Sequence, residues 1–240
     1  MMENIYYEKS APLLMRECDM FRRLKPSAVL SMFQDCSEAL TEGWGVGLDA
    51  MLQKGIIWVA AKVECAVKRL PEHGETVTVR GWAGRSRSGI FPFHYVLQDE
   101  AGQELLTGCS MWVLSDLKTH SMLAPNVPRL SLPTPEAEHA PLPRLRPIKP
   151  PAGDCAHTAR RVEFSETDIN GHLTNTRYMD WACDLVGADF HQKHPMTGLR
   201  INYRSETFPG QEVPLDWELT EERLYCASKG RFEIALFFDK

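Results

Sequence analysis

Prolines gather in one part of the chain and divide it in two. Nine of the sixteen prolines lie between Pro125 and Pro151. Proline has no backbone N–H to donate to a helix or a sheet, and it biases the preceding residue toward extended conformations. We therefore expect a linker there, running partly in the polyproline II conformation. The predicted division is an N-terminal domain over 1–128, the linker over 129–155 and a C-terminal domain over 156–240.

The same order of elements is expected on both sides of the linker. Apolar residues recur at helical spacing from Pro26 to Gly43, and again from Tyr178 to Val186. Strand-like runs bounded by turn residues follow each helix, at 56–70, 75–85, 90–99, 104–116, 198–208, 212–222, 224–230 and 231–239. This order predicts an α+β fold in which an antiparallel sheet follows each helix.

A shift of 149 residues (168 minus 19) aligns the two halves. Asp19 then matches Asp168, and Leu24 matches Leu173. Self-similarity at a fixed offset is typical of an internal duplication. We therefore expect two copies of one helix-and-sheet unit.

One polar cluster is present in the second half only. Asp168, Asn170 and His172 alternate within "SETDINGHLTN", whereas the first half has Phe21 and Arg23 where Asn170 and His172 stand. Alternate side chains of an extended segment face the same way, so we expect the acid, the amide and the imidazole to converge. One half would then carry the chemistry, and the other would mainly shape a pocket.

A helix is expected directly after this cluster. The N-terminus of a helix presents unpaired amides and the positive end of a dipole, which together bind an anion or a polarised carbonyl oxygen. The amides near Leu173 to Asn175 are therefore candidates for an oxyanion site. Any one of these polar residues, taken alone, is more typical of a capping loop. The occurrence of all these polar residues together is what favours a catalytic site.

The chain resembles one family over nearly its whole length. The segment "DINGHLTN" followed by "RYMDW" is similar to the D-x-N-x-H-x-N-N signature of the acyl-acyl carrier protein thioesterases, plant and bacterial enzymes that end fatty acid synthesis. In the first half, "GIIWVAAKVECAVKRLPEHGETVTVRGWAG" and "DEAGQELLTGCSMWVLSDLKTH" resemble the same family. The resemblance implies a tandem (double) hotdog fold, in which each half is a long helix wrapped by an antiparallel β-sheet.

The resemblance also implies roles for single residues. Asp168, Asn170 and His172 match the family's catalytic acid, amide and histidine. Glu206, in the strand-like segment "NYRSET", matches its downstream catalytic glutamate. Taken alone, Glu206 would be interpreted as a solvated acid at a strand edge.

Two positions depart from the family pattern. Thr174 stands where the signature has the first asparagine of its N-N pair, and Thr207 stands where plant members carry a cysteine. A threonine hydroxyl is a poor substitute for a thiolate, which makes covalent catalysis at that position a poor hypothesis. The expected mechanism is general-base hydrolysis, in which Glu206 or Asp168 takes a proton from the attacking water.

The expected reaction is hydrolysis of fatty acyl-acyl carrier protein to free fatty acid and carrier protein. Coenzyme A esters are an alternative substrate, and a non-catalytic acyl-binding module is an alternative of another class. A hotdog hydratase, with the motif D-x-N-x-x-H, is disfavoured because His172 lies four residues after Asp168 instead of five.

The composition of the 240 residues limits the remaining functions. A net charge of −5 gives no sign of a nucleic-acid partner, and no run approaches the roughly 18 apolar residues of a membrane span. The opening "MMENIYYEKS" lacks the pattern of a signal peptide, so a cytoplasmic protein is expected. Seven cysteines without a CxxC pair argue against disulfides or a zinc site. We expect no metal and no cofactor, and either a monomer or a homodimer.

Overall fold

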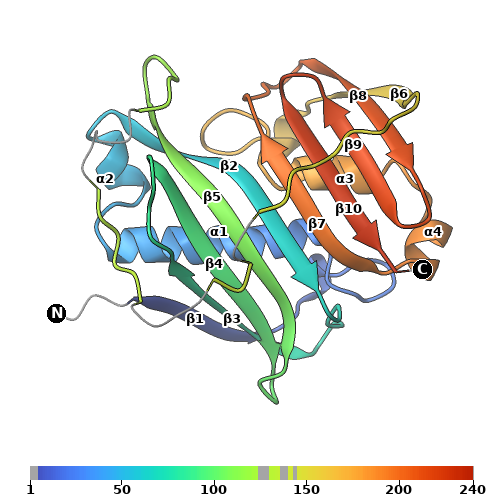
Figure 1. Ribbon diagram of the computed structural model, residues 1–240, viewed down its shortest axis with the longest axis horizontal. Helices are drawn as coiled ribbons and strands as arrows, with labels where there is room; N and C mark the ends of the chain where they lie inside the picture. The colour runs from blue at the N-terminus through green and yellow to red at the C-terminus, as the bar shows by residue number, and fades with distance from the viewer. Residues whose placement is uncertain (1–4, 124–129, 136–139, 143–144, 240) are drawn as a thin grey trace.

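Figure 1 shows the computed structural model of the chain, which describes residues 5–123, 130–135, 140–142 and 145–239. The helices and short 3-10 turns are α1 (Pro26–Gly43), α2 (Leu48–Leu52), α3 (Arg177–Cys183), α4 (Ala188–Lys193), η1 (Met15–Glu17) and η2 (Phe164–Glu166). The strands are β1 (Tyr6–Pro12), β2 (Ile56–Val67), β3 (Thr76–Ala83), β4 (Ile90–Asp99), β5 (Glu104–Asp116), β6 (Ala156–Arg161), β7 (Met196–Tyr203), β8 (Glu212–Leu219), β9 (Arg223–Ser228) and β10 (Phe232–Phe238).

All these strands belong to one sheet that repeats its order about its centre. The order is β1-β3-β4-β5-β2-β7-β10-β9-β8-β6, so the second half mirrors the first strand by strand. The two halves join where β2 pairs antiparallel with β7, from Lys62 opposite Asn202 to Ala66 opposite Gly198. The predicted α+β fold, with a duplicated helix-and-sheet unit, is confirmed.

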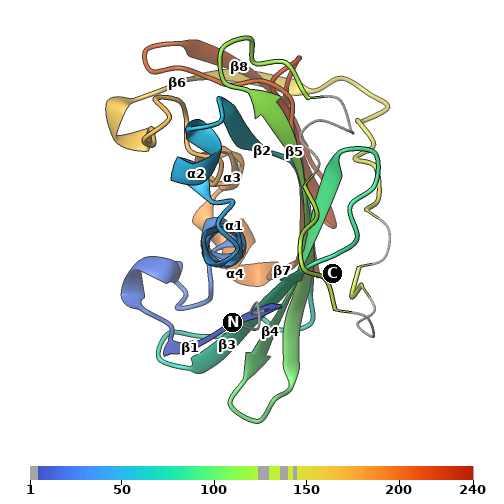
Figure 2. The same ribbon diagram turned by 90° about the vertical axis from the view of Figure 1, so that its left-hand side faces the viewer.

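The helices lie inside the curve of the sheet, and α1 packs closely against it (Figure 2). Its buried residues fall on one face, as the helical spacing predicts, and include Val29, Leu30, Phe33, Cys36 and Leu40. Two sheet glycines permit the close approach. A Cβ atom would lie 2.1 Å from the Phe33 ring at Gly108, and 2.2 Å from Cys36 Sγ at Gly81.

The helix of the second half is shorter than the resemblance implied. Tyr178, Met179 and Ala182 are buried on α3 as expected, but that helix ends at Cys183, and α4 begins after Gly187. Gly187 has an extended backbone, with φ −74° and ψ 160°, which interrupts the helix. The second half thus carries two short helices in place of one long helix.

Two strands were not predicted from the sequence. β4 and β5 match their predicted ranges, whereas β1 and β6 are edge strands whose residues are mostly exposed. An edge strand with few buried side chains lacks the apolar alternation that identifies a strand in a sequence. The prediction failed where that signal was absent.

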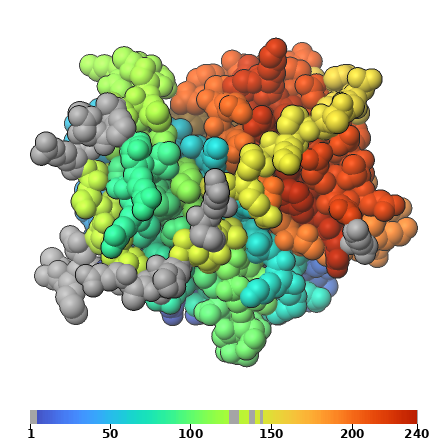
Figure 3. All heavy atoms as spheres, in the orientation of Figure 1, coloured from blue at the N-terminus to red at the C-terminus, as the bar shows by residue number. Residues whose placement is uncertain are grey.

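The described linker residues form no helix or strand and cross the outer face of the sheet, opposite the helices (Figures 2 and 3). Glu64 fixes the linker there. Its carboxylate accepts hydrogen bonds from Arg146 N at 2.7 Å and Arg146 Nε at 2.8 Å, and from Arg200 Nε at 3.0 Å. Glu64 lies opposite Arg200 in the β2–β7 pairing, so this cluster ties the linker to the junction of the halves. The predicted boundary at 128/129 lies outside the described residues.

None of the helices in the described ranges is long and apolar enough to span a membrane.

Glu64→Gln should test the ion cluster at the junction. The substitution leaves Arg200, whose side chain is only 13% exposed, without its counter-charge. We expect the free energy of unfolding to fall by about 3 kcal/mol, measured by urea denaturation. Glu8→Gln, which removes an exposed ion pair with Arg80, is the control and should cost about 0.5 kcal/mol or less. Equal losses in the two variants would contradict the role given to Glu64.

Candidate active site

The segment from Asp168 to His172 forms a tight turn. Asp168 N donates to His172 O at 3.1 Å, and Gly171 N donates to Asp168 O at 2.9 Å. Asn170 N donates to Asp168 Oδ1 at 2.9 Å, and Gly171 adopts a φ of +78°, which glycine tolerates without strain. The expectation of an extended segment was wrong. Asp168 and His172 approach because the turn closes, and Asn170 is exposed at its tip.

His172 lies between two carboxylates. Its Nδ1 atom is 3.9 Å from Asp168 Oδ1, and its Nε2 atom is 3.8 Å from Glu206 Oε1. β7 ends at Tyr203, so Glu206 lies in the loop after the strand and not within it as expected. The side chains of His172, Asp168 and Glu206 are 20%, 25% and 29% exposed, so water reaches all three. The structure therefore brings together three of the four predicted residues.

His120 is the site residue that sequence reasoning missed. Its Nδ1 atom is 3.4 Å from Glu206 Oε2, on the carboxylate oxygen that does not face His172. It comes from the loop after β5, in the other half of the chain. No local motif marks it, because its approach to Glu206 depends on the pairing of β2 with β7.

The backbone amides that precede α3 already have acceptors. Leu173 N donates to Thr207 O at 2.7 Å, and Thr174 N donates to Glu166 O at 3.0 Å. The helix itself begins at Arg177 and not directly after the cluster. The expectation that the amides of Leu173 and Thr174 form an oxyanion site was wrong, because both stabilise the folded loop instead.

Thr207 is buried and hydrogen bonded. It has no exposed surface, and its Oγ1 atom accepts hydrogen bonds from Tyr178 OH at 3.0 Å and from an Arg231 guanidinium nitrogen at 3.4 Å. Burial raises the pKa of Tyr178, which keeps that phenol a donor. Thr207 therefore fixes the loop that carries Glu206, and its hydroxyl is not placed to attack a substrate.

The first half repeats the turn without its chemistry. Asp19 N donates to Arg23 O at 2.7 Å, and Phe21 N donates to Asp19 Oδ1 at 2.9 Å, as in the second turn. Arg23, in the place of His172, forms an ion pair with Asp19 at 3.3 Å and donates to His191 O at 2.7 Å. The first turn is thereby bonded to α4 of the other half.

The residue equivalent to Glu206 also lacks a carboxylate. Leu24 N donates to Pro71 O at 2.9 Å, which repeats the bond from Leu173 N to Thr207 O. Leu70 therefore stands where Glu206 stands in the second half. Among the described residues, the set of two carboxylates around an imidazole at this turn belongs to the second half alone.

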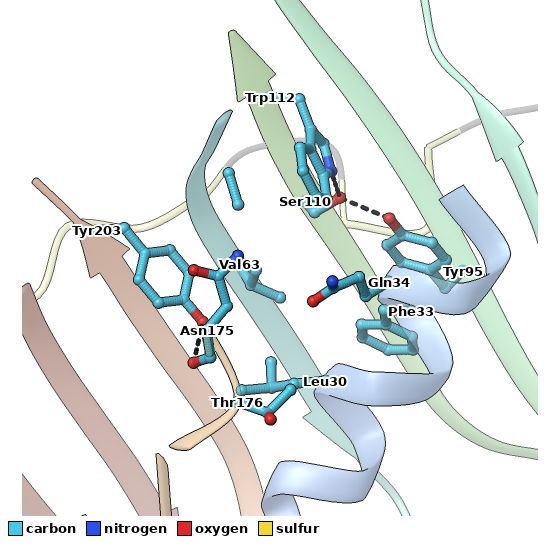
Figure 4. A pocket seen from close by; sticks show the side chains of 11 residues that line it. Leu30, Phe33, Gln34, Val63, Tyr95, Ser110, Trp112, Asn175, Thr176 and Tyr203 are labelled. Atoms are coloured by element: carbon cyan, nitrogen blue, oxygen red, sulfur yellow. Dashed lines mark hydrogen bonds between the residues drawn. The ribbon is translucent and has the colours of Figure 1, made fainter. Parts of the chain in front are cut away.

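A small cavity lies between α1, the sheet and the segment before α3 (Figure 4). Its volume is about 20 Å³, which is room for about one water molecule. Its lining residues are Leu30, Phe33, Gln34, Ala60, Val63, Tyr95, Ser110, Trp112, Asn175, Thr176 and Tyr203. Tyr203 OH donates to Asn175 O at 2.9 Å, and these two residues belong to the segments that carry Glu206 and His172. The cavity is thus lined by residues of both halves, most of them from the first.

Within the described ranges, no three His, Cys, Asp or Glu side chains are grouped so as to hold a metal ion.

Comparisons of the sequence identify relatives over most of its length. The family model described as the acyl-ACP thioesterase N-terminal domain matches residues 4–125, and the acyl-ACP thioesterase C-terminal domain matches residues 152–233. A chloroplastic acyl-acyl-carrier-protein hydrolase from Cuphea viscosissima is 22% identical over 217 residues, which are 85% of this chain and 52% of that protein. The chain spans about half the length of the curated relatives it matches.

Two solved structures share the fold over the whole chain. An acyl-ACP thioesterase from Bacteroides thetaiotaomicron has a TM-score of 0.86 at 18% identity and covers 99% of both chains. The 12:0-ACP thioesterase from Umbellularia californica has a TM-score of 0.78 at 17% identity, covering 100% of this chain and 99% of that one. The tandem hotdog fold expected from the sequence is confirmed.

Thr207→Val should test the support of the Glu206 loop. Valine keeps the volume but leaves the buried Tyr178 hydroxyl without its acceptor, so we expect the free energy of unfolding to fall by about 2 kcal/mol in urea denaturation. Thr158→Val, at an exposed position of β6, is the control and should change stability little. If the two variants proved equally stable, the hydrogen bond to Thr207 would not contribute as described.

Proposed function

This chain belongs to the acyl-ACP thioesterase family, and we propose that it hydrolyses fatty acyl-acyl carrier protein to free fatty acid and carrier protein. In a cell that reaction ends fatty acid synthesis. The observation that carries the proposal is the position of His172 between the carboxylates of Asp168 and Glu206. An imidazole and two carboxylates at a water-accessible site supply the groups that general acid–base catalysis needs.

Glu206 is the general base in this proposal. Its carboxylate takes a proton from a water molecule, and the resulting hydroxide attacks the thioester carbon. Glu206 lies between two imidazoles, at 3.8 Å from His172 and 3.4 Å from His120. Because 29% of its side chain is exposed, it is also accessible to water. The buried Thr207 beside it offers no competing nucleophile.

Asp168, His172 and Asn170 assist the same step. A carboxylate at Nδ1 of an imidazole fixes the ring tautomer and orientation, which is the role of Asp168 toward His172. Glu206 then passes the abstracted proton to Nε2 of His172, which faces its carboxylate, and His172 donates that proton to the leaving thiolate, so that both groups return to their starting protonation states. Asn170, exposed at the tip of the turn, donates its side-chain amide to the oxyanion.

The acyl chain enters the core of the N-terminal domain, which sets substrate specificity in this proposal. A cavity of about 20 Å³ is far smaller than a fatty acyl chain, so lining side chains such as Trp112 and Gln34 move when the chain enters. The acyl carrier protein delivers the chain from outside. A cytoplasmic location and a monomeric or homodimeric state stay predictions.

Removing any member of the cluster should abolish most turnover. We expect Asp168→Ala, His172→Ala and Glu206→Gln to lower kcat by about 10² to 10⁴-fold, the range for loss of a general acid or base. The assay is thiol release from acyl-acyl carrier protein, with circular dichroism to show that each variant is folded.

Asp19→Ala is the matched control for Asp168→Ala. It removes the same acid from the equivalent turn of the first half, where it pairs with Arg23. We expect this variant to keep near-normal turnover per folded molecule. Near-normal turnover by Asp168→Ala or His172→Ala would instead refute the assignment of the site.

Matched acyl chains on acyl carrier protein and on coenzyme A distinguish the two carriers. Faster thiol release from the carrier protein supports the proposed substrate. Faster release from coenzyme A would make the protein an acyl-coenzyme A thioesterase, and release from neither would indicate an acyl-binding module.

A further inference from the structure

The Glu206 carboxylate contacts an imidazole from each half of the chain. Oε1 faces His172 Nε2 at 3.8 Å, and Oε2 faces His120 Nδ1 at 3.4 Å. The side chain of His120 is 57% exposed, so its position against Glu206 is not imposed by burial. Another constraint must hold it there.

The fold brings the two loops to the same edge of the sheet. β5 and β7 both pair antiparallel with β2, one on each side of it, and therefore run parallel to each other. Strands two places apart in a sheet are about 9.5 Å apart. The loops that follow β5 and β7 thus extend toward the same end of these strands, where His120 and Glu206 meet.

The loop after β5 holds His120 in a defined place. Asp116 Oδ1 accepts hydrogen bonds from Lys118 N at 3.0 Å and from Thr119 N at 2.8 Å, and His120 N donates to Asp116 O at 2.9 Å. Asp116 N donates to Ser121 O at 3.0 Å, which closes the loop. His120 adopts a φ of +53°, a left-handed conformation that is costly for a residue other than glycine. The turn therefore maintains an unfavourable backbone at the residue that meets Glu206.

We propose that His120 is a positioning residue for Glu206, holding one oxygen of its carboxylate so that the other faces His172. The inference rests on the proposed function, since Glu206 is the general base there. The site is then completed across the two halves: the second half supplies the reacting groups, and the first half supplies the imidazole that orients the base.

The charged and titratable groups that act at this position come from several elements. His120 and His172 contact the carboxylate directly, Asp168 lies behind His172, and Tyr178 and Arg231 bond the adjacent Thr207. His120 is the group that faces Oε2, so loss of its imidazole should misplace Glu206.

The contact is tested first without turnover, by ring signals of histidine in ¹H–¹³C NMR spectra. Glu206→Gln should shift the signals of His120 and leave those of His157 unchanged. His157 is the matched control, because its Nδ1 lies 2.7 Å from Asp216 Oδ1 in an exposed pair on β6 and β8. An unchanged His120 signal would overturn the inference, whatever the activity.

The role is tested by turnover of His120 variants. We expect His120→Ala to lower kcat by about tenfold with little change in KM, as for a misplaced catalytic group. His120→Gln, which keeps a side-chain hydrogen-bond donor, should restore part of that loss. His157→Ala should match the wild-type protein in both kcat and KM.

The outcomes separate this inference from the proposed function. If the wild-type protein hydrolyses the substrate and His120→Ala keeps its kcat, the inference is overturned and the proposed function stands. If the wild-type protein hydrolyses neither carrier ester, the proposed function fails and the role of His120 in hydrolysis fails with it. The NMR comparison then still decides whether the contact exists.

Discussion

Residues 62–66 of β2 pair with residues 198–202 of β7, and this short ladder makes one sheet from two copies of a helix-and-sheet unit. The approach of His120 to Glu206 at the candidate site depends on it. The ladder sets β5 parallel to β7 on the far side of β2, so that their following loops meet. Glu64 and Arg200 lie opposite each other within it, and their ion pair also binds the linker through Arg146. A change in the register of this pairing would move Glu206 away from His120. It would also disrupt the ion pairs of Glu64 that hold the linker at the junction.

The duplicated turns show how one backbone serves two purposes. In both turns the backbone N–H of an aspartate donates to the residue four positions later and its carboxylate accepts from the residue two positions later, and both turns end against the loop of a neighbouring strand. In the first half, arginine and leucine stand at the critical positions, and Arg23 binds a backbone carbonyl of the other half. In the second half, His172 and Glu206 stand there instead and remain accessible to water. The turn that both halves share is thus a structural unit. The side chains at the positions of His172 and Glu206 decide whether it holds catalytic groups.

Much of the fold could be predicted because its signals are local. The helix from Pro26 to Gly43 and the strands β4 and β5 have clear periodicity and turn residues at their ends. The exposed edge strands β1 and β6 carry no such periodicity. The site was predictable as a set of residue types, with Asp168, His172 and Glu206 brought together as expected. Its geometry was not. The alternation of polar residues predicts an extended segment, whereas local hydrogen bonds close a turn at Gly171, and the acceptor of the Leu173 amide lies on the distant loop of Thr207. His120 could not be found, since no sequence pattern reveals which strands of the two halves pair.

Isotope transfer from water in a single turnover tests the central claim that Glu206 activates water and forms no bond to the acyl group. An excess of the protein is mixed with acyl-acyl carrier protein in ¹⁸O-labelled water, and the mass of the released fatty acid is measured by mass spectrometry. The account predicts that the acid formed in the first turnover carries one ¹⁸O atom from the solvent. Fatty acid with unlabelled oxygen, accompanied by ¹⁸O in the Glu206 carboxylate, would show that Glu206 attacks the thioester itself and would contradict the account.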